Sequence, residues 1–199
     1  MQRIHPLVVL ATCLALAGCL GRSALDELAR ETDPKGSAFD RTLFKNYSIL
    51  AHSFGKVSAL PGTTFDQEGS YALSDVDNSV AGLANGFARK ALDSGKGTDV
   101  APETAPDEAA TSYHLRLLHA LGRGRDQFPQ LAARTQVDYD CWVMNGRVES
   151  QAAASAACKR SLDKTLPELE RDVHQQEVQP VSNDTAPVNP ATNASPPGQ

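Results

Sequence analysis

Cysteine supplies the most reactive side chains in this sequence, and the four cysteines fall into two pairs of different character. Cys13 and Cys19 lie within or just after an apolar stretch near the N-terminus, whereas Cys141 and Cys158 lie in the body of the chain. A thiol can form a disulfide, bind a metal or accept a covalent lipid, and its neighbours in the chain favour one of these reactions. The cysteines are therefore the first candidates for chemistry.

The first 18 residues have the layout of a secretory signal peptide, in which a basic residue precedes an apolar run. Arg3 is that basic residue, and the run from Leu7 to Ala17 is too short for a membrane-spanning helix, which needs roughly 20 residues. The run ends in Leu16-Ala17-Gly18-Cys19, which resembles the lipobox of bacterial lipoproteins. A plain signal peptide with a chance cysteine, or an uncleaved anchor, is the alternative.

The resemblance to bacterial lipoproteins implies that Cys19 is the lipidation site and the first residue after cleavage. Its thiol would carry diacylglycerol, and its amine a further acyl chain such as palmitate. Two or more chains hold a protein stably at a bilayer, whereas one chain binds only marginally. Leu20 stands where an Asp would retain a lipoprotein in the inner membrane. We therefore expect a protein anchored to the outer membrane on its periplasmic side, with the membrane as a partner.

Cys141 and Cys158 remain after these reactions, and we expect them to form a disulfide. An exported compartment is oxidising, and an even number of remaining cysteines indicates pairing. Asn145-Gly146 favours a turn between them, so the flanking segments are expected to form a helical hairpin whose apolar stripes face one another. A metal site is the alternative, but His174 is distant in the sequence and the chain has no CxxC motif. No metal is expected.

Other motifs that could carry catalysis or bind a cofactor are incomplete. Gly95-Lys96-Gly97-Thr98 lacks the spacing of a phosphate-binding loop, and Gly122-Arg123-Gly124-Arg125 lacks the third glycine of a dinucleotide fingerprint. Asp138 and Asp140 are two positions apart on an expected helix, so their side chains should diverge on a solvated or capping face. We therefore expect no catalytic residue and no cofactor.

Apolar residues repeat every three or four positions over five stretches, which indicates amphipathic helices. The first stretch follows the capping-box pattern Ser37-Ala38-Phe39-Asp40, and a similar pattern, Ser74-Asp75-Val76-Asp77, opens the second. Gly122 and Gly124 are expected to fray the third. The five stretches are Phe39–Val57, Val76–Ala91, Ala110–Leu121, Phe128–Val148 and Ala154–Leu169. No stretch alternates with period two, so the expected fold is all-α, a helical bundle or antiparallel helical hairpins.

The sequence divides into four expected parts. These are a signal peptide at 1–18, a tether at 19–36 with a helical turn or two at 23–31, a helical domain at 37–174 and a tail at 175–199. The tail is rich in proline and asparagine and has no aromatic residue. It cannot bury enough apolar surface to offset the entropy lost on ordering, so we expect it to be disordered.

Size and charge exclude several classes of protein. The 199 residues suffice for one ordinary domain. The 19 Lys and Arg against 24 Asp and Glu leave a net charge of -5, which argues against a nucleic-acid partner. A mean hydropathy of -0.34 argues against a protein that crosses the membrane several times.

Several segments resemble the helical N-terminal region of OmpA-family outer-membrane lipoproteins from alphaproteobacteria. Gln136–Trp142 contains the Asp-Cys-Trp element of that region, and Ala156–Arg160 contains a second cysteine at similar spacing. Gly36–Asp40 and Leu43–Tyr47 resemble its opening. In that family a βαβ-type peptidoglycan-binding domain follows a linker. No segment here matches that domain, so the resemblance does not extend to peptidoglycan binding.

These observations favour a non-enzymatic, lipid-anchored lipoprotein of the cell envelope. It would act as a scaffold or interaction module at the outer membrane, with an envelope protein as a further partner. The alternative is an adaptor that binds a ligand or a protein during envelope assembly or transport.

Overall fold

The computed structural model describes residues 23–55 and 78–178, and within these ranges it contains helices and no strand. The long helices are α3 (Ala38–His52), α4 (Asn78–Gly95), α5 (Glu108–Gln127), α6 (Pro129–Gly146) and α7 (Ala152–Val178). A short helix, α2 (Ala24–Leu28), precedes them, and a 3₁₀ turn, η3 (Glu149–Gln151), joins α6 to α7. The expected all-α fold is confirmed.

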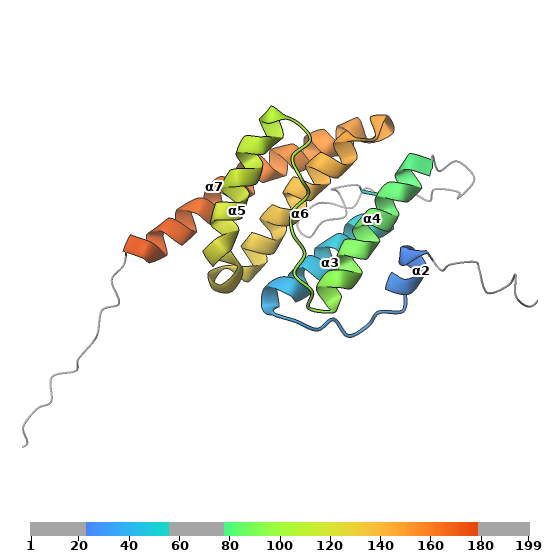
Figure 1. The fold of residues 1–199 in the computed structure, drawn as a ribbon, viewed down its shortest axis with the longest axis horizontal. Coiled ribbons are helices and arrows are strands. Elements are labelled where there is room, and N and C mark those ends of the chain that lie inside the picture. Colours follow the sequence, from blue (N-terminus) through green and yellow to red (C-terminus); the bar gives the residue numbers. More distant parts are fainter. Residues whose placement is uncertain (1–22, 56–77, 179–199) are drawn as a thin grey trace, which may run out of the picture.

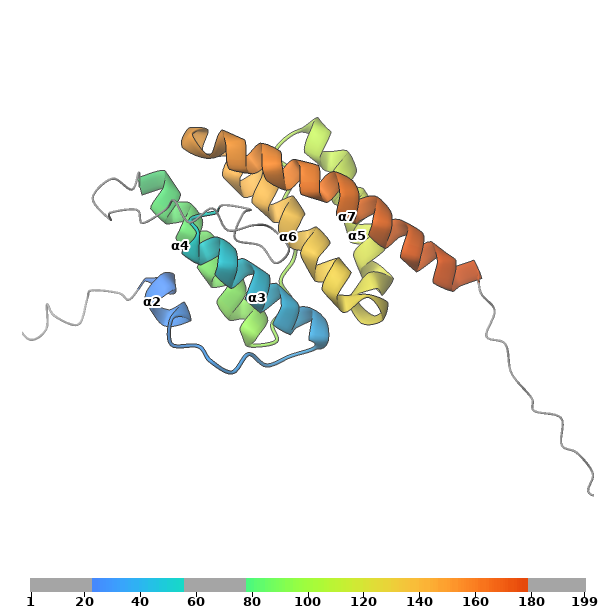
Figure 2. The same cartoon turned by 180° about the vertical axis from the view of Figure 1, so that it is seen from behind.

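Helix α6 is the centre of the bundle. It packs against α3, α5 and α7, while α4 packs against α3 and α2 lies against α4. Figures 1 and 2 show α5, α6 and α7 on one side of the molecule and α2, α3 and α4 on the other. Because α6 is covered by neighbours in several directions, most of its side chains are buried, including polar ones.

Local sequence signals explain where the helices begin. Ser37 and Asp40 form the predicted capping box of α3: the Ser37 hydroxyl accepts the Asp40 N–H at 3.1 Å, and the Asp40 carboxylate accepts the Ser37 N–H at 2.8 Å. Asp107 caps α5 by accepting the Ala110 N–H at 2.8 Å. The second predicted capping box, at 74–77, lies outside the described residues.

Helix α3 buries its predicted stripe but ends earlier than predicted. The buried stripe residues are Phe39, Leu43, Tyr47 and Leu50. The helix stops at His52 because the chain then turns: Phe54 has φ +54° and Gly55 φ +83°, and the Gly55 N–H bonds to the Leu50 carbonyl at 2.7 Å. Phe54 therefore does not continue the helix, and Val57 lies outside the described residues.

The segment before residue 37 contains the predicted helical turn, which is α2, and from Ser23 on it packs against the helical body. Ser23 opens α2 with a capping box, and Leu28 is buried in the core with only 3% of its surface exposed. The Lys35 N–H bonds to the Gly95 carbonyl at the end of α4 at 2.6 Å. The helical body therefore begins at Ser23 rather than at residue 37, because the single apolar face of this short helix has a partner in α4.

The prediction that glycines fray the third helix is wrong, because α5 continues through Gly122 and Gly124 to Gln127. The two glycines differ in surroundings. A Cβ at Gly124 would lie 2.9 Å from Leu169 Cδ1 on α7, whereas one at Gly122 would meet nothing within 4 Å. Gly124 therefore permits the close approach of α5 and α7.

Alanine substitutions should distinguish the open position at Gly122 from the packed position at Gly124. Gly122→Ala is expected to raise the free energy of unfolding by up to about 1 kcal/mol, because alanine loses less backbone entropy in a helix. Gly124→Ala should gain less or destabilise the protein, because the new methyl group must displace the buried Leu169. Urea unfolding measures both. An equal gain for both variants would contradict the close packing at Gly124.

Helix α7 is longer than predicted at its C-terminal end. It runs to Val178, past residue 175 where the tail was expected to begin, and it contains Pro167 on its exposed face. The remainder of the predicted tail, 179–199, lies outside the described residues.

Candidate functional site

The predicted disulfide between Cys141 and Cys158 is present, and it crosslinks α6 to α7 across the hairpin closed by η3. The two Cα atoms are 5.7 Å apart, and both cysteines are fully buried. Val137, Val148 and Leu162 of the predicted stripes are also buried. The pairing uses both thiols.

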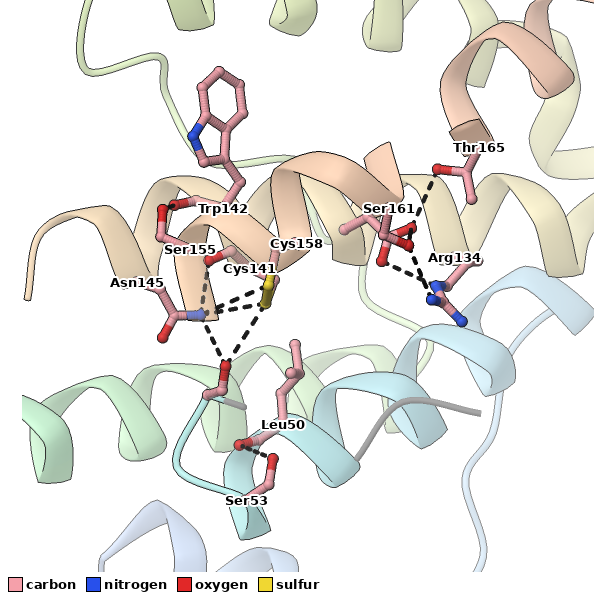
Figure 3. The surroundings of a disulfide bond; sticks show 12 residues. Leu50, Ser53, Arg134, Cys141, Trp142, Asn145, Ser155, Cys158, Ser161 and Thr165 are labelled. Carbon is pink, nitrogen blue, oxygen red and sulfur yellow. Dashed lines mark hydrogen bonds and ion pairs between the residues drawn. A yellow bond between two sulfur atoms is a disulfide. The ribbon is translucent and has the colours of Figure 1, made fainter. Parts of the chain in front are cut away.

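Asn145 connects the disulfide to the end of α3 (Figure 3). Its Nδ2 donates to the Gly55 carbonyl at 2.9 Å and to the Cys141 carbonyl at 2.8 Å, and it lies 3.2 Å from Cys141 Sγ. Asn145 is fully buried. The turn after α3 is thereby fixed to the same part of α6 that carries the disulfide.

Asp138 and Asp140 are fully buried, so the prediction of a solvated or capping face is wrong. Their side chains diverge as predicted, but each direction leads to a neighbouring element. Asp138 faces α7, and Asp140 faces α3, α4 and the segment 97–107. The burial of the two acids is not predicted because the sequence does not show that α6 is enclosed. The signal for it is the presence of two acids within a largely apolar stretch.

Asp140 is at the centre of a buried polar cluster. Its Oδ2 accepts the Tyr47 hydroxyl at 2.5 Å and lies 3.0 Å from the Lys90 ammonium, while its Oδ1 accepts the Glu103 N–H at 2.8 Å. Lys90 Nζ is also 3.2 Å from Glu103 Oε1. Both oxygens of the buried carboxylate are therefore occupied by groups of the chain itself.

This cluster, Tyr47, Lys90, Glu103 and Asp140, holds the segment 97–107 across α6. Lys90 Nζ donates to the Ala101 carbonyl at 2.9 Å, and Gln136 Nε2 on α6 donates to the Val100 carbonyl at 2.6 Å. In Figure 1 the segment runs over α6 from the end of α4 to the start of α5. The connection between the two sides of the bundle therefore depends on buried polar contacts as well as on apolar packing.

Burial and neighbouring charges shift the pKa values within the cluster. Burial raises the pKa of Asp140, and the Lys90 ammonium and the Tyr47 hydroxyl offset only part of that rise. Burial lowers the pKa of Lys90, but the carboxylates of Asp140 and Glu103 outweigh it, so the pKa is raised. Burial, followed by the Asp140 charge, raises the pKa of Tyr47. The tyrosine therefore stays protonated and donates to Asp140.

Asp138 forms a second buried contact, between α6 and α7 (Figure 3). Its Oδ1 lies 2.9 Å from Arg134 Nε, and its Oδ2 accepts the hydroxyls of Ser161 at 2.8 Å and Thr165 at 3.2 Å. Burial raises its pKa, and the Arg134 charge opposes the rise. Asp138 and the disulfide thus join the same two helices at different positions along their length.

A half-buried cluster of two aromatic rings and a lysine lies where α5, α6 and α7 meet; its members are Tyr113, Trp142 and Lys159. The Tyr113 and Trp142 rings meet edge to face with centroids 5.3 Å apart, and Lys159 Nζ lies 4.0 Å from the Tyr113 centroid. Lys159 Nζ donates to the Tyr113 hydroxyl at 2.7 Å, and that hydroxyl donates to Asp163 at 2.9 Å. Trp142, singled out as part of the Asp-Cys-Trp element, is therefore a packing residue between three helices.

The other predicted residues fall in different places. Cys19 lies outside the described residues. His174, considered above as a metal ligand, is exposed on α7. Within residues 23–55 and 78–178, no three His, Cys, Asp or Glu side chains are grouped so that they could hold a metal ion. Among the described helices, none is both long and apolar enough to cross a membrane.

Comparison with known proteins gives no match: no family model, no curated protein and no solved structure corresponds to this chain. The resemblance to OmpA-family lipoproteins therefore stays a proposal that rests on the residues that carry it.

Proposed function

We propose that this chain is a non-enzymatic lipoprotein, anchored through Cys19 to the periplasmic side of the outer membrane, and that its helical body is a scaffold or interaction module of the cell envelope. The similarity of residues 36–47, 136–142 and 156–160 to OmpA-family lipoproteins belongs to the same proposal. The membrane is one partner and an envelope protein the other.

The observation that carries this proposal is Leu16-Ala17-Gly18-Cys19 behind the basic and apolar segments of a signal peptide. The motif combines a leucine, two small residues and a cysteine at the end of the apolar run, where processing and lipidation take place. A lipid on the first residue after cleavage leaves the whole helical body outside the bilayer.

The crosslinked body supports an exported location. Disulfides persist in oxidising compartments, such as the periplasm, and are rare in the cytosol. The disulfide between Cys141 and Cys158 is buried near the turn of the α6–α7 hairpin rather than exposed for exchange. Its place in the core supports a structural role in a protein that folds after export.

The surface of α5 supports the alternative of a protein-binding adaptor. Leu115 is 62% exposed and Leu118 is 44% exposed, and both lie on this helix one turn apart. The charged residues at the centre of the bundle bind one another, so binding energy for a partner must come from such outer faces. A partner crosslinked reproducibly in the envelope supports a scaffold, and a small ligand that raises the melting temperature supports an adaptor.

Metabolic labelling with palmitate tests the lipid anchor. The wild-type protein should incorporate label, and Cys19→Ala should incorporate none, because no other cysteine occupies the processing site. Cys13→Ala is the matched control: it removes a cysteine from the signal peptide and should keep the label. Equal labelling of the wild type and Cys19→Ala would refute the anchor. Label confined to inner-membrane fractions of a density gradient would refute the outer-membrane location.

A further inference from the structure

Few residues separate Cys19, the proposed lipidation site, from the folded body. Helix α2 is part of the body, because Leu28 is buried and the Leu25 N–H bonds to Asn85 Oδ1 on α4 at 3.4 Å. The tether therefore consists of the chain from Cys19 to Ser23, and not of the expected residues 19–36. Four residues span at most about 14 Å even when fully extended.

This reach is small compared with the membrane and the protein. The headgroup layer of one leaflet is roughly 5–7 Å thick, so about 7–9 Å of the reach remains beyond it. An α-helix with its side chains is about 10–12 Å wide. If this tether joins the body to the glycerol of a membrane lipid, Ser23 must stay within one helix diameter of the headgroups.

The tether emerges on the side of the body formed by α2 and α4. An open hollow of about 540 Å³ lies between these helices, and its charged lining residues are Glu27, Arg89, Asp93 and Lys96. The Lys96 ammonium is 3.7 Å from Glu27, and all four residues are exposed. Two cations and two anions line the hollow, so the phosphate and the ammonium of one headgroup each meet residues of opposite charge there.

The other end of the chain leaves the body on the opposite side. In both Figure 1 and Figure 2 the C-terminal end of α7 and helix α2 lie at opposite ends of the molecule. If the body is attached to the membrane near α2, the C-terminal end of α7 lies at the end of the molecule that is far from the attachment.

We propose that the α2–α4 side of the body rests on the phospholipid headgroups of the membrane that carries the anchor, while α5 and α7 face the periplasm. This inference rests on the lipidation proposed for Cys19. The occupant of the α2–α4 surface is a layer of zwitterionic headgroups, as in phosphatidylethanolamine. The exposed leucines of α5 then remain accessible to a protein partner.

Lysine modification on vesicles tests this orientation. The lipidated protein is reconstituted into vesicles of phosphatidylcholine, a zwitterionic lipid whose quaternary ammonium does not react with amine reagents, with a minor share of phosphatidylglycerol. The vesicles are treated with a water-soluble amine reagent, and the modified lysines are quantified by mass spectrometry. Lys96, with 57% of its side chain exposed, probes the α2–α4 side, and the exposed Lys164 on α7 probes the far side.

The matched control is a lipidated variant with 20 Gly and Ser residues inserted between Arg22 and Ser23. This linker spans about 22–27 Å on average, enough to let the body turn freely. Modification of Lys96 should be at least about threefold slower with the native tether than with the long one, because the headgroups lie within one helix diameter. Modification of Lys164 should be the same in both proteins.

The outcomes separate this inference from the lipid anchor. Equal rates at Lys96 in the two proteins, with lipid on Cys19 verified by intact mass, overturn the orientation and leave the anchor standing. Slower modification of Lys164 with the native tether than with the long one, with Lys96 unchanged, shows the opposite orientation and likewise overturns it. An intact mass without lipid overturns both.

Discussion

Replacing Asp140 with alanine is expected to lower the free energy of unfolding by about 3–5 kcal/mol, the cost of removing one partner from a buried ion pair. The carboxylate is fully buried and accepts the Tyr47 hydroxyl and the Glu103 N–H, and it pairs with the Lys90 ammonium. Without it, the buried tyrosine hydroxyl and the backbone N–H lose their acceptors. Urea unfolding followed by circular dichroism measures the change.

Two further variants show that the loss comes from the buried contacts. Glu170→Ala removes the partner of Arg116 in an exposed ion pair and should cost at most about 1 kcal/mol. The double variant Asp140→Ala/Lys90→Met should lose less than the sum of its single variants, because it removes both charges together. A loss for Asp140→Ala no greater than that for Glu170→Ala would refute the role of the cluster.

Removing the disulfide with Cys141→Ala/Cys158→Ala is expected to lower the free energy of unfolding by about 3 kcal/mol. The crosslink closes a loop of 17 residues, and in the chain-entropy model it destabilises the unfolded state by that amount. The double substitution avoids leaving a single reactive thiol. Urea unfolding of the variant and the wild type measures the difference.

Reduction provides an independent check on the same bond. The wild type in a strong reductant should unfold at nearly the same urea concentration as the double alanine variant, and the variant itself should not respond to the reductant. Thiol titration of the unreduced, denatured wild type should find neither Cys141 nor Cys158 free. Two free thiols in protein taken from the periplasm would contradict the disulfide.

The sequence predicts the helices well because their signals are local. The stripe Phe39, Leu43, Tyr47 and Leu50 marks the buried face of α3, and the capping box at Ser37 marks its start. Both depend only on neighbours within a few positions. The pairing of Cys141 with Cys158 is likewise predictable, since the processing proposed for the N-terminus leaves only these two cysteines.

The errors arise where a residue's surroundings come from distant parts of the chain. The acids at positions 138 and 140 look like surface residues until α3, α5, α7 and the segment 97–107 enclose α6. Gly124 looks like a helix breaker until Leu169 of α7 packs against it. Local propensity is a weak guide at such positions, because tertiary packing contributes more than the cost of a glycine in a helix.

The sequence by itself determined that the described chain is helical, where most helices begin and which cysteines pair, because these properties follow from periodicity, caps and counting. It is also the source of the proposed lipid anchor at Cys19. Only the tertiary structure decided that Asp138 and Asp140 are buried and that α2 docks on α4, because burial depends on which helices become neighbours. The length of free chain between anchor and body, and hence the side proposed to face the membrane, follows from that docking.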